Sequence, residues 1–118
     1  YRTLLEQVSL HPMMGIYLTH LANQREDPAT GRSPDENYAR EVMQLMSIGV
    51  FELNNDGTLR RDAQGNPIPT YTANDISQLA KVFTGWSYYH PNPTNNTFFG
   101  GNRNADAFVR PMIAYPQY

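Results

Sequence analysis

Two helix-capping motifs divide this chain of 118 residues. In the first, Ser33-Pro34-Asp35-Glu36, the serine is a good N-cap, proline suits the first helical position, and the glutamate is spaced to bond back to the cap. Apolar residues then recur at helical spacing as far as Met46, and Gly49 stands where a helix end adopts a left-handed conformation. The pattern predicts a helix over residues 34–48.

The second motif is Thr72-Ala73-Asn74-Asp75, followed by an apolar stripe and closed by Gly85. It predicts a helix over residues 73–84. Trp86 lies just beyond the glycine, where an apolar side chain often packs back on the last helical turn. We therefore expect Trp86 to have a structural role.

Apolar residues at helical spacing also predict two helices before the first motif, over residues 2–10 and 12–24, with Pro12 beginning the second. Turn sequences rich in Asn, Asp and Gly bracket short extended pieces at 50–71, which indicates a hairpin-like excursion. The fold class predicted is mainly α, with four helices.

The last part of the chain, residues 87–118, is rich in Pro, Asn and aromatic residues and has no periodicity. It is predicted to be an irregular tail that continues into further sequence. Residues 1–86 are then the helical part of a larger domain.

Composition bears on several classes of function. Nine Lys and Arg against eleven Asp and Glu give a net charge of −2 without a basic cluster, which argues against nucleic-acid binding. Cysteine is absent, and the three histidines lack the spacing of a metal site, so neither a metal nor another cofactor is predicted. No apolar run approaches the roughly 20 residues of a membrane span.

One polar stripe on the predicted 34–48 helix is a candidate catalytic site. Asn37, Arg40 and Glu41 fall on one side of the helix, where Glu41 would be an acid or base oriented by the other two. A solvated helix face accounts for the same pattern. The stripe is therefore compatible with an enzyme or with an ordinary surface.

Aromatic residues at the start of the tail are a candidate binding site. Trp86, Tyr88 and Tyr89 would stack on sugars or on a partner's surface. The same rings would equally pack inside the protein.

Three stretches carry a family resemblance: Ser-Pro-Asp-Glu-Asn-Tyr-Ala-Arg-Glu-Val-Met-Gln-Leu at 33–45, Ile48-Gly49-Val50, and Tyr-Thr-Ala-Asn-Asp-Ile at 71–76 with Thr84-Gly85-Trp86. Together they resemble the domain of unknown function 1800 family over residues 4–86. The resemblance implies a large, mainly helical bacterial protein, exported to the periplasm or beyond, of which this chain is an internal piece. The segment Leu45-Met46-Ser47-Ile48-Gly49 lacks a histidine that the family often has there, which argues against a histidine ligand.

The leading hypothesis for function is a structural or interaction segment that packs against the remainder of the parent polypeptide. A hydrolase acting on cell-envelope or polysaccharide material, using Glu41, Asn37 and Arg40, is one alternative. A glycan-binding module that uses the aromatic residues from Trp86 onward is another.

Overall fold

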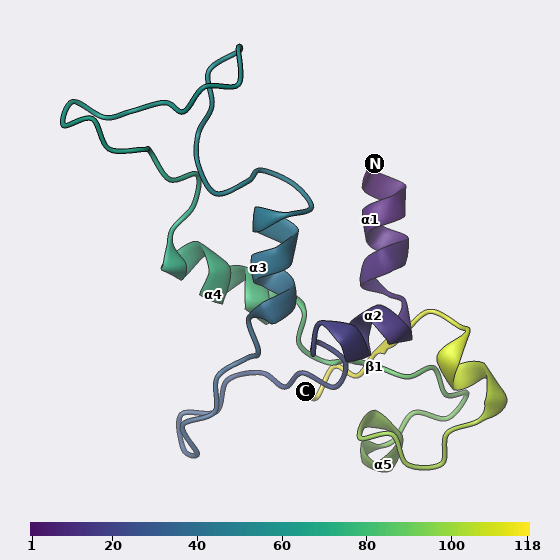
Figure 1. Cartoon of the computed structure of the whole chain (residues 1–118). Helices are drawn as coiled ribbons and strands as arrows, with labels where there is room; N and C mark the ends of the chain where they lie inside the picture. The colour runs from purple at the N-terminus through teal and green to yellow at the C-terminus, as the bar shows by residue number, and fades with distance from the viewer.

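The computed structural model describes all of residues 1–118 and contains five short α-helices, one 3₁₀ helix and a two-stranded sheet (Figure 1). Only 34% of the structure is helix and 10% is strand, so the prediction of a mainly α chain with four helices is wrong. The elements are, in chain order, α1 (Arg2–Ser9), α2 (Pro12–Tyr17), α3 (Asn37–Gln44), α4 (Ala73–Val82), β1 (Trp86–Ser87), α5 (Asn95–Phe98), the 3₁₀ helix η1 (Ala105–Phe108) and β2 (Ile113–Ala114).

Helix α4 begins where its capping box predicts. The Thr72 hydroxyl accepts a hydrogen bond from the Asp75 N–H at 3.3 Å, and the Asp75 carboxylate accepts one from the Thr72 N–H at 2.8 Å. The helix ends at Val82, two residues earlier than predicted, and Gly85 follows with a φ of 76°. Local interactions therefore define this helix.

Helix α3 is shorter than the predicted helix over residues 34–48 at both ends, because it begins at Asn37 and ends at Gln44. A distant side chain accounts for the late start. The Asn23 side chain bonds both backbone groups of Asp35, accepting from its N–H at 2.8 Å and donating to its carbonyl at 3.2 Å. The Asp35 carboxylate in turn accepts from the Asn37 N–H at 2.9 Å, while the N-cap residue, Glu36, forms no side-chain capping bond. The capping box predicted at Ser33 does not form, and α3 begins at Asn37.

Helix α2 ends at Tyr17, so the predicted helix over residues 12–24 is also wrong. Thr19 and Ala22 both adopt positive φ angles, of 61° and 57°, which a right-handed helix excludes. The Ala22 N–H donates instead to the Trp86 carbonyl at 2.8 Å. Helix α1, in contrast, is within one residue of the predicted 2–10.

Two small buried regions hold the chain together. Where α3 crosses α4, Ala39, Ile76 and Ala80 form a close-packed centre. The second region lies in the tail, where strands β1 and β2 pair antiparallel, with Trp86 opposite Ala114 and Ser87 opposite Ile113. Phe98, Ala107, Met112 and Tyr115 are buried there. The tail contains only the short elements α5, η1 and β2, and aromatic packing orders the irregular segments between them.

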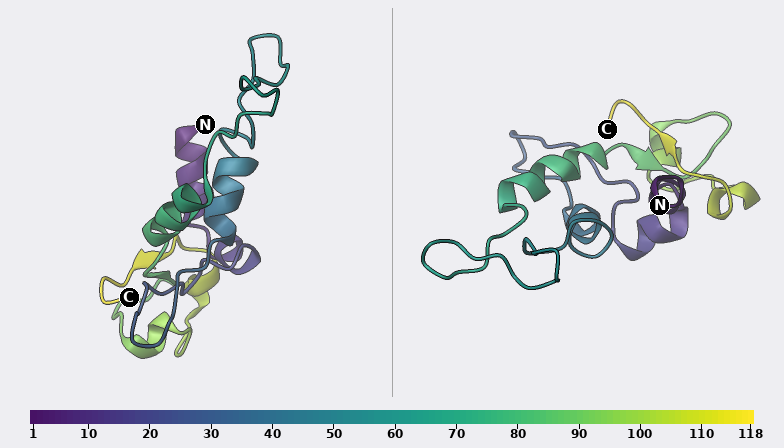
Figure 2. Two further views of the ribbon diagram at one scale, coloured as in Figure 1. Left: turned by 90° about the vertical axis from the view of Figure 1, so that its left-hand side faces the viewer. Right: turned by 90° about the horizontal axis from the view of Figure 1, so that it is seen from above.

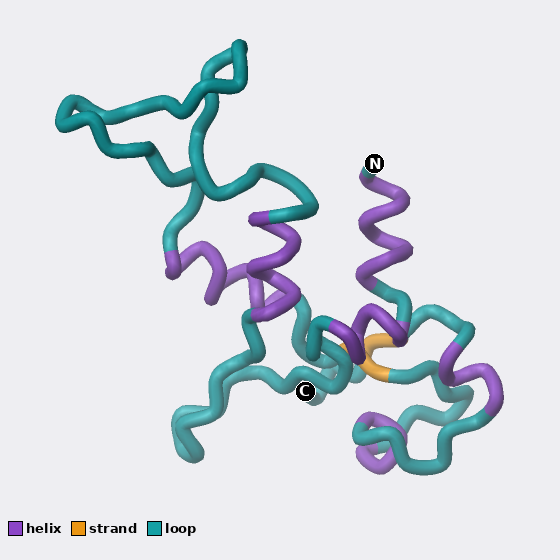
Figure 3. The backbone as a smooth tube through the Cα atoms, viewed as in Figure 1, coloured by secondary structure: helices purple, strands orange, loops and turns teal.

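The excursion between α3 and α4 is a protruding arm, defined here as residues 50–70, which contains no helix or regular strand (Figure 3). Three backbone hydrogen bonds close it in a ring: Glu52 donates to Ile68 at 2.9 Å, Ile68 to Arg60 at 3.1 Å, and Arg60 to Glu52 at 2.9 Å. The Thr70 N–H joins the two ends of the arm by donating to the Val50 carbonyl at 3.0 Å. The arm is thus a hydrogen-bonded unit rather than a simple hairpin.

The molecule as a whole is thin and extended, measuring 56 × 36 × 18 Å, as the two further views show (Figure 2). Its radius of gyration is 17.3 Å, whereas a compact domain of this length has about 13.5 Å. The accessible surface is 7595 Å², which is about 1,100 Å² above the value usual for this mass. Much surface therefore remains uncovered, and it includes exposed large apolar side chains such as Leu4 and Tyr17.

Candidate functional site

The polar stripe on α3 does not form a catalytic constellation. The Asn37 side chain donates to the Thr19 hydroxyl at 2.9 Å, and the Arg40 guanidinium pairs with Glu36 at 3.3 Å on an exposed face. Glu41 is half-buried, and its Oε2 is buried without a hydrogen-bond partner. None of the three lines any of the five main cavities. The structure therefore places each of them on α3 without bringing them together around one ligand position.

The aromatic residues proposed for binding are separated by their packing. Tyr88 is only 6% exposed and meets Phe108 edge-on at 5.5 Å. The half-buried Tyr89 ring lies under the Arg110 guanidinium at 4.6 Å. The Trp86 indole N–H donates to the Val82 carbonyl at 3.3 Å, in the last turn of α4. The three rings do not form a continuous exposed platform for a sugar.

A buried polar cluster lies where the loop after α2 meets α3 and α4. His20 is 1% exposed and stacks on Tyr38 with ring centroids 3.9 Å apart, while Phe83 packs edge-on against both rings. The Tyr38 hydroxyl is 2.6 Å from the Ser9 hydroxyl at the end of α1. The sequence predicts that His20 lies in a helix over residues 12–24. No local pattern indicates that its side chain points inward, so this cluster is not predicted.

The electrostatics of the cluster favour neutral side chains. Burial lowers the pKa of His20 below its ordinary value of 6.5, against smaller opposing effects of the Ser9 carbonyl and Asp35. Burial also raises the pKa of the Tyr38 phenol. The His20 Nε2 lies 2.9 Å from the Ser9 carbonyl, whereas its Nδ1 is buried without a partner. The cluster therefore contains one unused hydrogen-bonding atom.

The cluster opens onto a cavity of about 280 Å³ between the ends of α1 and α4. Its walls are mainly apolar and include Phe83 and Trp86. Three polar residues, Glu6, Ser9 and His20, also line it. Apolar walls with a few polar groups are typical of binding sites for small ligands.

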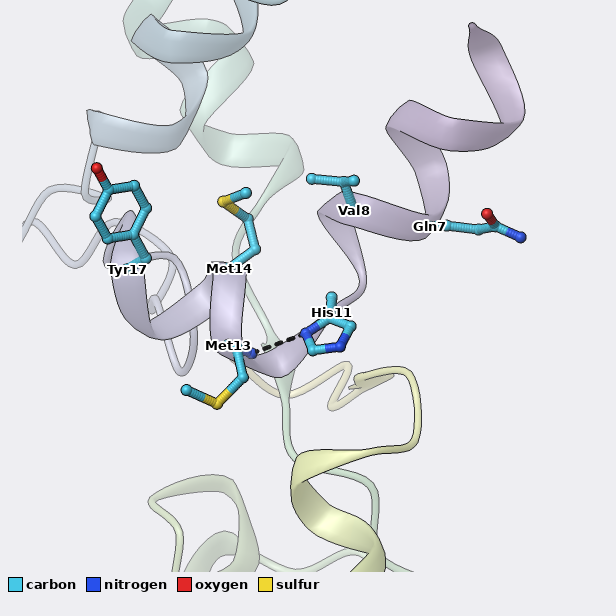
Figure 4. Close-up of a pocket in the computed structure, with 6 residues that line it drawn as sticks. All are labelled: Gln7, Val8, His11, Met13, Met14 and Tyr17. Atoms are coloured by element: carbon cyan, nitrogen blue, oxygen red, sulfur yellow. Dashed lines mark hydrogen bonds between the residues drawn. The ribbon is translucent and has the colours of Figure 1, made fainter.

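A larger cavity, of about 420 Å³, lies between α1 and α2 (Figure 4). His11 lines it, but its Nδ1 is used to cap α2 by accepting from the Met13 N–H at 3.2 Å. Figure 4 shows the thioethers of Met13 and Met14 pointing in different directions, away from the His11 ring. These soft ligands do not converge on one position that a metal would occupy.

No group of three or more His, Cys, Asp or Glu side chains is placed to hold a metal ion. None of the helices combines the length and the apolar composition needed to cross a bilayer.

Comparison with known proteins identifies the family. Searches of curated proteins and of solved structures each found no match to this chain. The sequence profile of the family described as "Protein of unknown function (DUF1800)" matches residues 1–114. The match thus confirms the resemblance and extends it through most of the tail. Because it covers nearly the whole sequence, this chain belongs to the DUF1800 family.

Proposed function

We propose that this chain is a structural and interaction segment of a larger, exported bacterial protein, and that the remainder of the parent polypeptide covers its apolar surface. The observation that supports this proposal is the extended fold, with about 1,100 Å² of surface beyond the expectation for its mass. That excess is similar to one side of a stable protein interface, about 800 Å². The exported location rests on the family resemblance alone.

Helix α1 is the clearest uncovered element. None of its residues is buried, and Leu4 is 63% exposed. Leu4, Leu5 and Val8 face an apolar groove of about 320 Å³ that is completed by Leu45 and Met46 after α3. An amphipathic helix gains most of its stability by burying such a face. The groove is therefore suited to an apolar segment of the parent protein.

The distribution of exposed apolar side chains favours the parent polypeptide over a second copy of the chain. They occur on α1, on α2, on the arm and in the tail, rather than in one patch. A two-fold dimer buries one self-complementary patch on each subunit. Examples are Leu4 (63%), Tyr17 (78%), Leu53 (57%) and Val109 (72%). Covering all of these regions requires protein on several sides.

The structure around the polar stripe supports the hydrolase alternative less than it supports the interaction proposal. Glu41 has one buried, unpaired oxygen, but it lines none of the main cavities, and the Arg40 side chain is turned to Glu36. The glycan-binding alternative is weakened by the burial of Tyr88. The interaction proposal accounts for the larger part of the exposed apolar surface.

A matched pair of substitutions in the full-length protein tests the proposal. Leu4→Asp is expected to lower the free energy of unfolding by about 2 kcal/mol or more, because a charge would enter a covered apolar site. Thr3→Asp, on an exposed position of the same helix, should change it by less than about 0.5 kcal/mol. Equal, small effects of both would contradict the proposal. A concentration-dependent effect of Leu4→Asp, with a change in oligomeric state, would identify a second copy as the covering partner instead.

A further inference from the structure

Three extended pieces of the arm, residues 51–53, 59–61 and 67–69, meet through isolated bridges. The ring of backbone hydrogen bonds joins only their middle residues, Glu52, Arg60 and Ile68. In an extended strand the backbone groups of successive residues point to opposite sides, so the two flanking residues of each piece present theirs outward. The arm projects away from the helices (Figures 1 and 2). It therefore has three outer edges.

Two of these edges carry features that oppose the addition of another strand. Pro67 and Pro69 leave the edge at 67–69 without any outward N–H group. On the edge at 59–61, Arg61 is exposed and forms no ion pair, and its guanidinium donates to the Gly65 carbonyl at 2.7 Å. Prolines and free charges are the usual means by which proteins prevent pairing at an edge strand.

The edge at 51–53 lacks both features. The backbone N–H and C=O groups of Phe51 and Leu53 form no hydrogen bond with the rest of the chain. Their side chains are 40% and 57% exposed, and the one charge between them, on Glu52, is paired with Arg60. Free N–H and C=O groups two residues apart, beside apolar side chains, are what an extended peptide binds when it adds to a sheet edge.

The small size of this edge indicates where the added strand comes from. A stable interface between separate proteins uses about 20–30 residues from each partner, whereas this edge provides the three residues 51–53. A segment of the same polypeptide needs no such area, because its tether holds it at an effective concentration of about millimolar. The parent polypeptide is therefore favoured over a separate protein or a second copy.

We propose that residues 51–53 bind an extended segment of the parent polypeptide as an added β-strand. The segment would exchange backbone hydrogen bonds with Phe51 and Leu53 and place uncharged, apolar side chains beside theirs. This inference rests on the proposed function, because it takes the parent polypeptide as the partner. It goes further by assigning the site on the arm and the conformation of the segment that binds there.

Residue-resolved hydrogen exchange of the full-length protein tests the proposal. The amides of Phe51 and Leu53 are expected to exchange at least about tenfold more slowly than free amides, because a bonded amide exchanges only when the added strand opens. The amides of Leu59 and Arg61 are the matched control, since they also have no partner in the chain, and they should exchange rapidly. Rapid exchange at Phe51 and Leu53, or equal protection of all four amides, would overturn the proposal.

Two proline variants distinguish backbone pairing from simple burial. Leu53→Pro removes an outward N–H that the arm itself does not use, and it should abolish the slow exchange of the Phe51 amide. Leu59→Pro removes the equivalent N–H from the edge that carries Arg61 and should leave that slow exchange intact. Equal effects of the two variants would contradict pairing at residues 51–53.

The same exchange experiment identifies the source of the strand. Rates that are independent of protein concentration are expected for a segment of the parent polypeptide, whereas rates that change on dilution would reveal a separate molecule and overturn the assignment. Leu4→Asp reports on the α1 groove and not on the arm. If Leu4→Asp is destabilising while Phe51 and Leu53 exchange rapidly, the strand proposal fails alone; slow exchange with a neutral Leu4→Asp would contradict only the covered groove.

Discussion

The imidazole of His20 stacks on the phenol of Tyr38, with ring centroids 3.9 Å apart and ring planes at 23°. His20 lies in the loop after α2, and Tyr38 lies in α3. Phe83, at the end of α4, meets Tyr38 edge-on at 4.8 Å. The stack therefore joins the N-terminal helices to the α3 and α4 pair, and its stability depends on the charge of the imidazole.

Acid should destabilise the protein through His20. Above pH 6.5 the imidazole is neutral in both the folded and the unfolded states, so its contribution is constant. Because burial lowers the folded-state pKa, only the unfolded state takes up a proton as the pH falls below 6.5. The free energy of unfolding should then decrease until the pH reaches the folded-state pKa. Melting temperatures at pH 7.5, 6.0 and 5.0 measure this loss.

Two variants isolate that titration. His20→Phe keeps an aromatic ring beside Tyr38 but removes the proton-binding group, so it should be less sensitive to pH between 6.5 and 5. His90→Gln changes a histidine in the tail, whose Nδ1 contacts only the backbone of the nearby Asn92, 2.8 Å from its carbonyl oxygen and 3.1 Å from its nitrogen. This variant should retain the full acid sensitivity. Equal pH dependence in His20→Phe and the unmodified protein would rule out His20 as the origin.

The capping box of α4 should contribute measurable stability. Thr72→Ala removes the hydroxyl that accepts from the Asp75 N–H, and the expected loss is about 1 kcal/mol in the free energy of unfolding. Thr72→Ser, which retains the hydroxyl, serves as the control and should lose much less. Chemical denaturation measures both. A Thr72→Ala protein as stable as Thr72→Ser would show that tertiary packing, rather than the cap, maintains α4.

The tail should be an ordered part of the fold. Phe98 is fully buried and stacks on Tyr118 with ring centroids 3.8 Å apart and planes at 3°. Phe98→Ala is expected to cost about 3–5 kcal/mol, because it leaves a cavity. Phe99→Ala removes the neighbouring ring, which is 59% exposed, and should cost less than about 1 kcal/mol. Equal, small effects on thermal unfolding would mean that the tail is not packed as described.

Parts of the candidate site could be predicted from the sequence only in outline. The pattern placed Asn37, Arg40 and Glu41 on one helix, and α3 contains all three. It did not predict that Thr19 would bind Asn37 or that Glu36 would bind Arg40. The cavity lined by Glu6, His20 and Trp86 joins residues from three separated segments, and no local pattern links them.

Local sequence specifies α4, the left-handed glycines at positions 49 and 85, and most of α1. In these places the stabilising contacts lie within a turn or two of the chain, where spacing and residue type specify them. Family membership was also readable from motifs. These features do not depend on distant parts of the chain.

Contacts between distant segments set where α2 ends, where α3 begins and how the tail packs. Asn23 binds the backbone of Asp35, and the Trp86 carbonyl binds Ala22, so hydrogen bonds between distant residues replace helical ones. In the tail, the stack of Phe98 on Tyr118 orders a segment without periodicity. Helical propensity amounts to less than about 1 kcal/mol per residue, so a buried polar or aromatic contact formed at a distance overrides it.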